Sequence, residues 1–352
     1  MEISFETAAW INNKLIFPVW NYDAVFSYNF ETQELENFEK YNLLEYNNGP
    51  KYGSIQITDN QLILCPLYSN EVLILNFGSG SSKKIKLKLF ELPKDLFFES
   101  CIYKNNIYLF PGTYSAIVKI NLKTYDVQYF DDVVNKIRMS TNGNIIRHGI
   151  VQVENIAYFA CTSINKLIKF DLETGLGELL DVNIDNNLSS VSESDDKNEI
   201  YILTICGDVY IYNLISGKSK LLCKGIGVTE KVAYSEIQYD KNNNIVVIFP
   251  FAEKNIRLYD INNKESYIIS CGGETFWTSQ HNGEIYAYIH SQNKLIIMDT
   301  LNKCIKEEVD LNDDCVKMEE TRKFKLKHKI FNAGCYQELE SNSLETYIKY
   351  IV

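Results

Sequence analysis

The chain has 352 residues, of which 45% are hydrophobic and 23% charged, a composition that excludes a disordered or coiled-coil protein. Glycine (17) and proline (6) are scarce, which excludes collagen-like and linker-rich chains, whereas Tyr (24) and Phe (18) are abundant. The net charge of -11 argues against a non-specific nucleic-acid binder or a binder of anionic membranes, because both need a surplus of basic residues.

The first residues and the cysteines together predict a cytoplasmic protein. The N-terminal segment has no basic stretch followed by an apolar core, so it does not predict a signal peptide. No window approaches the length of uninterrupted apolar sequence that a membrane span requires. The nine cysteines are odd in number and form no Cys-x-x-Cys pair, which favours buried, reduced thiols over a disulfide framework.

Seven short apolar runs recur along the chain at intervals of 40 to 49 residues, each after a polar turn. The first aliphatic residues of these runs are Leu15, Leu62, Ile107, Ile156, Ile200, Ile245 and Ile285. Each run is too short for a helix and is rich in β-branched and aromatic residues. Each run therefore predicts a buried strand.

A further strand follows each run after a short loop, and an Asn or Asp closes it 13 to 15 residues after the first aliphatic residue. These closing residues are Asn29, Asn76, Asn121, Asp171, Asn213, Asp260 and Asp299. An Asx side chain can accept hydrogen bonds from the following backbone, and the glycine that completes turns such as 171–175 supplies a positive φ. The pattern predicts a hairpin into a last, more polar strand, for example over 127–130.

One more strand, the innermost, should precede each apolar run. The candidate segments are 3–8, 54–57, 100–103, 148–153, 191–193, 235–239 and 276–279. A unit of about 45 residues with four strands is typical of a β-propeller blade. We therefore predict an all-β protein with one seven-bladed β-propeller of four-stranded blades over residues 1–309. An open β-solenoid is the structural alternative, although its coils are usually shorter.

Residues 310–352 fall outside the repeat and predict a short C-terminal tail. Apolar residues and lysines alternate over 321–331, which indicates a half-buried strand with a lysine face in solvent. Asn342 and Glu345 resemble a capping box, and the apolar spacing after them predicts a short amphipathic helix. We expect this strand and helix to dock on the propeller.

The repeat units resemble those of the kelch and quinoprotein-type propeller superfamilies over most of the chain. The double glycine of kelch repeats occurs once, at Gly272-Gly273, and Asp171-Leu-Glu-Thr-Gly175 is similar to the quinoprotein turn. The Trp-Asp dipeptide of another propeller family and the sialidase-type Asp box are absent. The resemblance implies an architecture only, and no catalytic residue or cofactor follows from it.

Sequence motifs of enzymes and metal sites are missing. The chain has no nucleophile elbow, Walker A loop or G-x-G-x-x-G sequence. The four histidines are not at ligand spacing from one another or from a cysteine, so we predict no metal and no cofactor. The alternating lysines of 83–89 indicate an outer strand with a solvated face and not a nucleic-acid patch.

Several charged residues lie in or beside the predicted innermost strands, which converge on the axis of a propeller. The candidates for this central funnel are Glu99, Arg147, His148 and Glu236, and Glu6 and Glu193 have similar positions. Such side chains can form a polar funnel for a cation or a sugar, or an acid–base pair. The competing interpretation is that channel-facing positions are wet and tolerate charge without any chemistry.

A second set of candidates is aromatic and belongs to the loops after the seven apolar runs, which all emerge on one face of a propeller. The candidate binding residues are Trp20, Tyr22, Tyr68, Tyr114, Phe251 and His290. Exposed aromatic side chains anchor partners because they bury a large area at a low cost in entropy. The alternative is that these rings pack between the blades.

Two functions follow from these observations. The first is a non-catalytic module that binds a protein or peptide through the face bearing the loops after the second strand of each blade. The alternative is a lyase or hydrolase that acts on a sugar or peptide in the central funnel through acids such as Glu99 and Glu236. Clustered, buried acids with shifted pKa values would favour the enzyme, whereas solvated acids under an exposed aromatic rim would favour binding.

Overall fold

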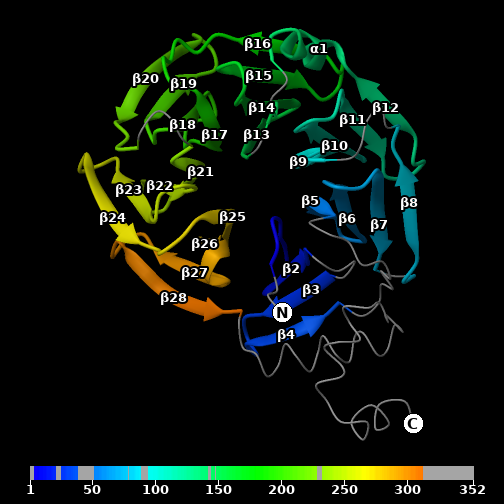
Figure 1. Cartoon of the computed structure of the whole chain (residues 1–352), viewed down its shortest axis with the longest axis horizontal. Coiled ribbons are helices and arrows are strands. Elements are labelled where there is room, and N and C mark those ends of the chain that lie inside the picture. The colour runs from blue at the N-terminus through cyan, green and yellow to red at the C-terminus, as the bar shows by residue number, and fades with distance from the viewer. Residues whose placement is uncertain are drawn as a thin grey trace, which may run out of the picture.

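The computed structural model describes residues 4–20, 25–38, 51–77, 79–88, 94–141, 144–146, 148–227 and 232–311. The strands in this part of the chain form seven four-stranded antiparallel sheets arranged as blades around one axis (Figure 1). The predicted all-β, seven-bladed propeller is therefore confirmed. The predicted tail strand and helix fall in residues 312–352, outside the described part.

Each blade consists of four strands that are consecutive in the chain, from the axis outward. The first blade is β1 (Ala9–Ile11), β2 (Lys14–Pro18), β3 (Val25–Asn29) and β4 (Glu34–Asn37). The second is β5 (Tyr52–Ile57), β6 (Gln61–Pro66), β7 (Glu71–Asn76) and β8 (Ser82–Lys86), and the third is β9 (Phe97–Tyr103), β10 (Asn106–Pro111), β11 (Ile117–Asn121) and β12 (Val127–Phe130). The fourth is β13 (Ile150–Val153), β14 (Ile156–Cys161), β15 (Lys166–Asp171) and β16 (Gly177–Leu180).

The remaining blades follow the same order. The fifth is β17 (Leu188–Glu193), β18 (Glu199–Thr204), β19 (Val209–Asn213) and β20 (Lys218–Cys223). The sixth is β21 (Tyr234–Asp240), β22 (Ile245–Pro250), β23 (Asn255–Asp260) and β24 (Glu265–Ser270), and the seventh is β25 (Thr275–His281), β26 (Glu284–Ile289), β27 (Lys294–Asp299) and β28 (Cys304–Asp310). The apolar runs of the sequence are thus the second strands, and the Asx-closed strands are the third.

The position of a strand within its blade explains its composition. All six residues of β22 are buried, because the sheets of the two neighbouring blades cover both of its faces. The outermost strand β24 alternates between exposed and half-buried residues, because one of its faces meets solvent. This difference in burial explains why the second strands are continuous apolar runs, whereas polar and apolar residues alternate in the fourth strands.

Within the described part of the chain, side-chain packing joins the first and last blades. The first sheet contains β1–β4 and the last contains β25–β28, and no described strand is shared between them. Phe5, which is fully buried, stacks on Phe17 of the first blade at 4.4 Å and on Tyr288 of the last at 4.1 Å between ring centroids. Trp277 Nε1 donates a hydrogen bond of 3.1 Å to the carbonyl oxygen of Ala8.

The predicted Asx turns are present between the third and fourth strands of the blades. Asp171 Oδ1 accepts hydrogen bonds from the backbone N–H groups of Glu173 (2.8 Å) and Thr174 (3.0 Å). Asn29, Asn121, Asn213, Asp260 and Asp299 accept in the same way. Asn76 Nδ2 donates to the oxygens of Ser81, and Gly78, the second residue after Asn76, lies outside the described residues.

The predicted innermost strand at 3–8 is wrong, because the first strand is β1 at Ala9–Ile11. Ile11 pairs with Lys14 across a two-residue turn, in which Asn12 has a φ of 53°. This tight turn makes Ile11 the last residue of β1. The segment before β1 is irregular and reaches toward the middle of the ring (Figure 1).

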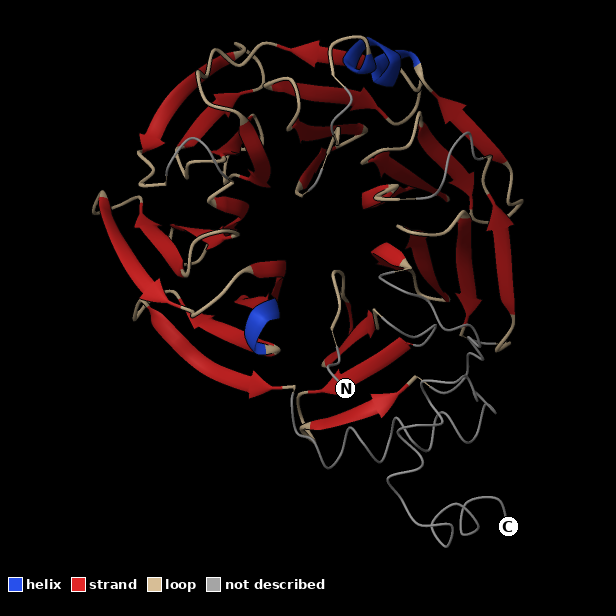
Figure 2. Cartoon of the chain, viewed as in Figure 1, coloured by secondary structure: helices blue, strands red, loops and turns tan. Residues whose placement is uncertain are grey.

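Within the described residues, two short helices interrupt the strand pattern (Figure 2). Helix α1 (Asp132–Arg138) buries Val133, Val134 and Ile137 between the third and fourth blades. The 3-10 helix η1 (His290–Gln292) lies between β26 and β27. No helix in the described ranges has the length and apolarity needed to cross a bilayer.

Candidate functional site

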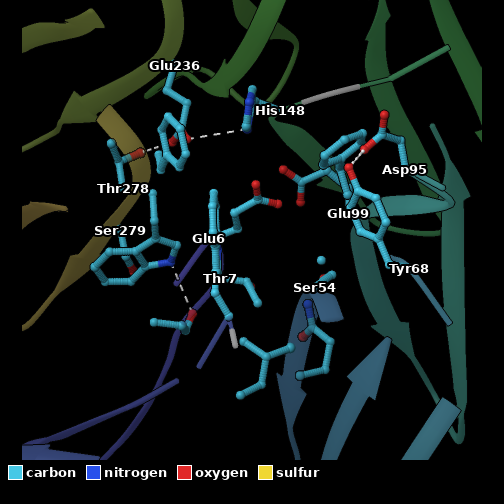
Figure 3. A pocket seen from close by; sticks show the side chains of 18 of the residues that line it. Glu6, Thr7, Ser54, Tyr68, Asp95, Glu99, His148, Glu236, Thr278 and Ser279 are labelled. Carbon is cyan, nitrogen blue, oxygen red and sulfur yellow. Dashed lines mark hydrogen bonds and ion pairs between the residues drawn. The ribbon is translucent and has the colours of Figure 1, made fainter. Parts of the chain in front are cut away.

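A pocket of about 510 Å³ opens at one end of the central channel (Figure 3). Its walls include Trp20, Tyr68 and Phe251, which follow β2, β6 and β22. It therefore opens on the face that bears the loops after the second strands. The acids of the candidate funnel line the same pocket, so the structure brings part of both predicted sets together.

Repeated β-bulges shape the wall of this pocket. In β9, Glu99 pairs with Phe110 and Phe97 with Pro111, so Phe98 is an extra residue. The same shift occurs near the start of β5, β17, β21 and β25, where the extra residues are Gly53, Ser189, Ser235 and Phe276. A bulge breaks the alternation of side chains and redirects them locally. Phe98 and Phe276 consequently line the pocket together with Glu99 and Glu236.

Glu99 and Glu236 lie deep in the channel, on opposite sides in Figure 3. Glu99 Oε1 accepts a hydrogen bond of 2.9 Å from the backbone N–H of Gly149, and Glu236 accepts one from the hydroxyl of Thr278. Loss of hydration raises the pKa of Glu99 to about 8, and the charge of Glu236 adds to this rise while the Gly149 N–H opposes it. Loss of hydration also raises the pKa of Glu236 to about 7, against the effect of Thr278.

His148 and Glu6 complete the polar floor of the pocket. His148 Nδ1 lies 3.4 Å from Glu236 Oε1, a contact that becomes an ion pair when the imidazole is protonated. Glu6 belongs to the irregular segment before β1 and directs its carboxylate toward that of Glu99 in Figure 3. Three carboxyl groups from three distant parts of the chain therefore point into one space.

Aromatic rings cluster on one side of the pocket. Phe276 stacks on His290 at 4.1 Å with 3° between the ring planes, and Phe251 lies 6.2 Å from Phe276 at 15°. Trp20 lies 4.9 Å from His290 and 5.9 Å from Phe276. Trp20 Nε1 has no hydrogen-bond acceptor within the described part of the chain. His290 stacks on Phe276 but does not itself line the pocket. We call Trp20, Phe251 and Phe276 the aromatic wall.

The other aromatic candidates have different positions. Tyr68 is 37% exposed at the pocket, and its hydroxyl donates a 3.0 Å hydrogen bond to Asp95 Oδ1. The expectation of an exposed ring at Tyr114 is not met: this residue is 3% exposed and packs against Phe97, between the second and third blades. Tyr22 lies outside the described residues.

The charged candidates also separate. Arg147 lies outside the described residues, and Glu193 is exposed at the opposite end of the central channel. A second hollow of about 660 Å³ opens there and shares Glu99, Glu236 and Thr278 with the first. These three side chains thus stand midway along the channel. In the described ranges, no three His, Cys, Asp or Glu side chains are grouped so that they could hold a metal ion.

Phe98, Phe276, Asp95 and Thr278 are pocket residues that were not among the predicted site residues. Phe276 and Thr278 do lie in a predicted innermost strand, so their closeness to the axis could be inferred. Their direction could not, because the bulges leave no mark in the apolar pattern. Phe98 and Asp95 precede the predicted strand, and nothing in the sequence pattern marked them as pocket residues.

The chain matches no protein-family model and no curated protein by sequence. Among solved structures it is similar to the computationally designed Ika8 protein, with a TM-score of 0.58, 12% identity, and coverage of 88% of this chain and 87% of that one. It is also similar to Hsv2 of Kluyveromyces lactis, with a TM-score of 0.57, 9% identity, and coverage of 87% and 98%.

A third similar structure is PorZ, a surface component of the type-IX secretion system of Porphyromonas gingivalis. Its TM-score is 0.56 at 13% identity, over 85% of this chain and 37% of PorZ. At these identities the likeness establishes the propeller fold and carries no function.

Proposed function

We propose that the chain is a non-catalytic module that binds a protein or peptide through the face bearing the loops after the second strands. The observation that carries this proposal is the 510 Å³ pocket, in which the aromatic wall and the glutamates come together. A concave site that combines aromatic side chains with charged groups can recognise one side chain of a partner. Binding of one partner side chain would use both features.

A smaller hollow beside the pocket supports an extended partner. It measures about 400 Å³ and shares His148 with the main pocket. Its remaining lining is mostly hydroxyl and amide side chains: Thr141, Asn144, Thr162, Ser163, Asn187, Ser189 and Ser235. The surface that these residues expose to the hollow is mainly apolar, so it can hold an apolar side chain of a peptide whose neighbouring side chain enters the main pocket.

Selection from a random-peptide display library on the purified chain tests this proposal. We expect enriched peptides that bind the wild type, and Tyr68→Ala should weaken them about thirtyfold, the effect of losing a central interface aromatic. Tyr267→Ala, on the outermost strand β24, is the matched control and should leave binding unchanged. Enrichment of no peptide, or equal weakening by both variants, would refute the proposal.

A second candidate is supported by one specific observation. Glu99 and Glu236 have raised pKa values in one pocket, so one can be protonated and the other ionised near neutral pH. This arrangement suits a hydrolase or lyase acting on a sugar or peptide. The two acids meet the condition that favours an enzyme, and aromatic rings could stack on a sugar. We place this function second because no sequence motif of a hydrolase or lyase accompanies the acids.

Turnover of a panel of 4-nitrophenyl glycosides and chromogenic peptides tests the enzyme. Release of nitrophenol that is abolished by Glu99→Gln would support it. Absence of turnover over the whole panel, between pH 5 and 9, would argue for the binding module.

Two further expectations remain proposals. The relationship to kelch or quinoprotein-type propellers is supported by the blade number and the turn chemistry. A reducing, cytoplasmic location is supported by the cysteines of the described ranges, which are all free thiols. Cys304 differs from the expected burial, because it lies exposed on β28.

A further inference from the structure

We propose that the pocket receives the guanidinium group of an arginine side chain on the partner, an inference that rests on the proposed function. The charge of the lining supports a cation. Among the described residues that line the pocket, the carboxyl groups of Glu6, Asp95, Glu99 and Glu236 outnumber the basic groups of Lys94 and His148. Lys94 is exposed to solvent, and His148 lies beside Glu236, so the described floor is acidic.

The order of groups along the channel indicates a long side chain with a charged end. The aromatic wall and Tyr68 belong to or pack against the loops at the mouth, whereas Glu99 and Glu236 stand midway along the channel. An apolar stem would therefore contact the rings while its end reached the carboxyl groups. Arginine and lysine both have this form.

The scattered acids favour arginine over lysine. A guanidinium group is planar and carries five N–H donors in a fixed geometry. The three deep carboxyl groups come from the segment before β1, from β9 and from β21, so they approach from different directions. A planar group with donors on three sides can serve all of them, whereas an ammonium group acts as a compact point charge.

The protonation of the acids makes this binding dependent on pH. A bound cation favours the ionised carboxylates, so it lowers the pKa values of Glu99 and Glu236 and expels their protons. Affinity should therefore rise with pH from 6 to 9. Among the described residues, the titratable and charged groups that share one of the two hollows with these acids are Glu6, Tyr68, Lys94, Asp95, His148, Glu193, Tyr239 and Lys241. The thiol of Cys101 also interacts electrostatically with Glu99.

Isothermal titration of the full chain with Nα-acetyl-L-arginine methylamide tests the inference. The neutral citrulline analogue has nearly the same shape without the charge, and the lysine analogue has the charge without the plane. We expect the arginine compound to bind at least about tenfold more tightly than either analogue. We also expect its affinity to rise about tenfold from pH 6 to 8, with release of protons.

Two substitutions test whether the arginine compound binds in this pocket. Glu236→Gln keeps the shape and the Thr278 contact and should weaken binding of the arginine compound at least about tenfold. Glu193→Gln, at the opposite end of the channel, should leave it unchanged. Equal binding of the citrulline analogue, tighter binding of the lysine analogue, or equal effects of the two variants would overturn the inference, as would binding of Ca²⁺ or Mg²⁺ in place of the organic cation.

Peptide display separates this inference from the function on which it rests. Enriched peptides with an arginine at a fixed position would support both. Enriched peptides that are lost in Tyr68→Ala but share no arginine would overturn the arginine inference and leave the binding module standing. An arginine compound that binds at Glu236 while no peptide is enriched would contradict the binding module alone.

Discussion

The carboxyl group of Glu99 holds its proton more tightly in the folded chain than in the unfolded one. Its pKa is about 8 in the pocket, against an ordinary 4.5, because burial removes its hydration and Glu236 lies near. The stability gained from the protonated form is complete below about pH 4.5 and is lost as the pH rises through 8. The structure thus predicts that Glu99 destabilises the fold in alkaline solution.

Glu99→Gln should remove this penalty, because a neutral amide can keep the hydrogen bond from Gly149. We expect the variant to match the wild type at pH 5 and to be more stable by roughly 1–3 kcal/mol at pH 9, since the channel admits some solvent. Thermal unfolding at both pH values measures the difference. The exposed Glu193→Gln should show no such pH dependence, and a pH-independent effect of Glu99→Gln would contradict the assignment.

Tyr114 and Tyr68 separate a core aromatic from a rim aromatic. Tyr114 is 3% exposed and Tyr68 37% exposed, although both follow the second strand of their blades. Tyr114→Ala should cost about 3–5 kcal/mol of unfolding free energy, because it leaves a cavity between two blades. Tyr68→Ala should cost about 1 kcal/mol or less. Denaturant titration compares them, and equal costs would show that the two positions are misassigned.

Two glycines in hairpin turns distinguish backbone strain from a steric clash. Gly175 and Gly80 both have a positive φ, of 77° and 64°. A Cβ on Gly175 would lie 2.1 Å from a ring atom of Phe130, whereas a Cβ on Gly80 would meet nothing within 4 Å. Gly80→Ala should therefore cost about 1 kcal/mol and Gly175→Ala about 3 kcal/mol or more, as measured by denaturant titration. Similar costs for the two variants would mean that the backbone of the fourth blade shifts away from the Phe130 side chain.

The packing of the first blade against the last makes ring closure depend on a few aromatic residues. Phe5 is fully buried between Phe17 and Tyr288. Phe5→Ala should lower the unfolding free energy by about 3–5 kcal/mol and preserve a single thermal transition. Leu301→Ala, 67% exposed on the seventh blade, is the control and should have little effect. A wild-type melting temperature for Phe5→Ala would show that the ring closes by other contacts.

Second strands were predictable because their residues are buried on both faces. Third strands were predictable because an Asx turn follows them. First strands were harder. The strand β1 is only three residues long, and its place is set by the tight turn at Asn12, which nothing in the apolar pattern marks. Helix α1 could have been found from the spacing of Val133, Val134 and Ile137, which share one helical face.

At the scale of the whole molecule, the sequence predicted which residues approach the axis but not which of them face one another. Glu99 and Glu236 were candidates because their strands converge, yet the bulges beside them and the channel segment of Glu6 decide where the side chains point. Three-dimensional convergence of residues from such distant parts of the sequence has no local signal. The pocket is therefore a property of the closed ring.

A crystal structure of the chain with a display-selected peptide tests the central claim most directly. The account predicts that the peptide crosses the face bearing the loops after the second strands, with one side chain between the aromatic wall and Glu236. A peptide bound at the opposite end of the channel near Glu193, or along an outermost strand such as β24, would contradict it.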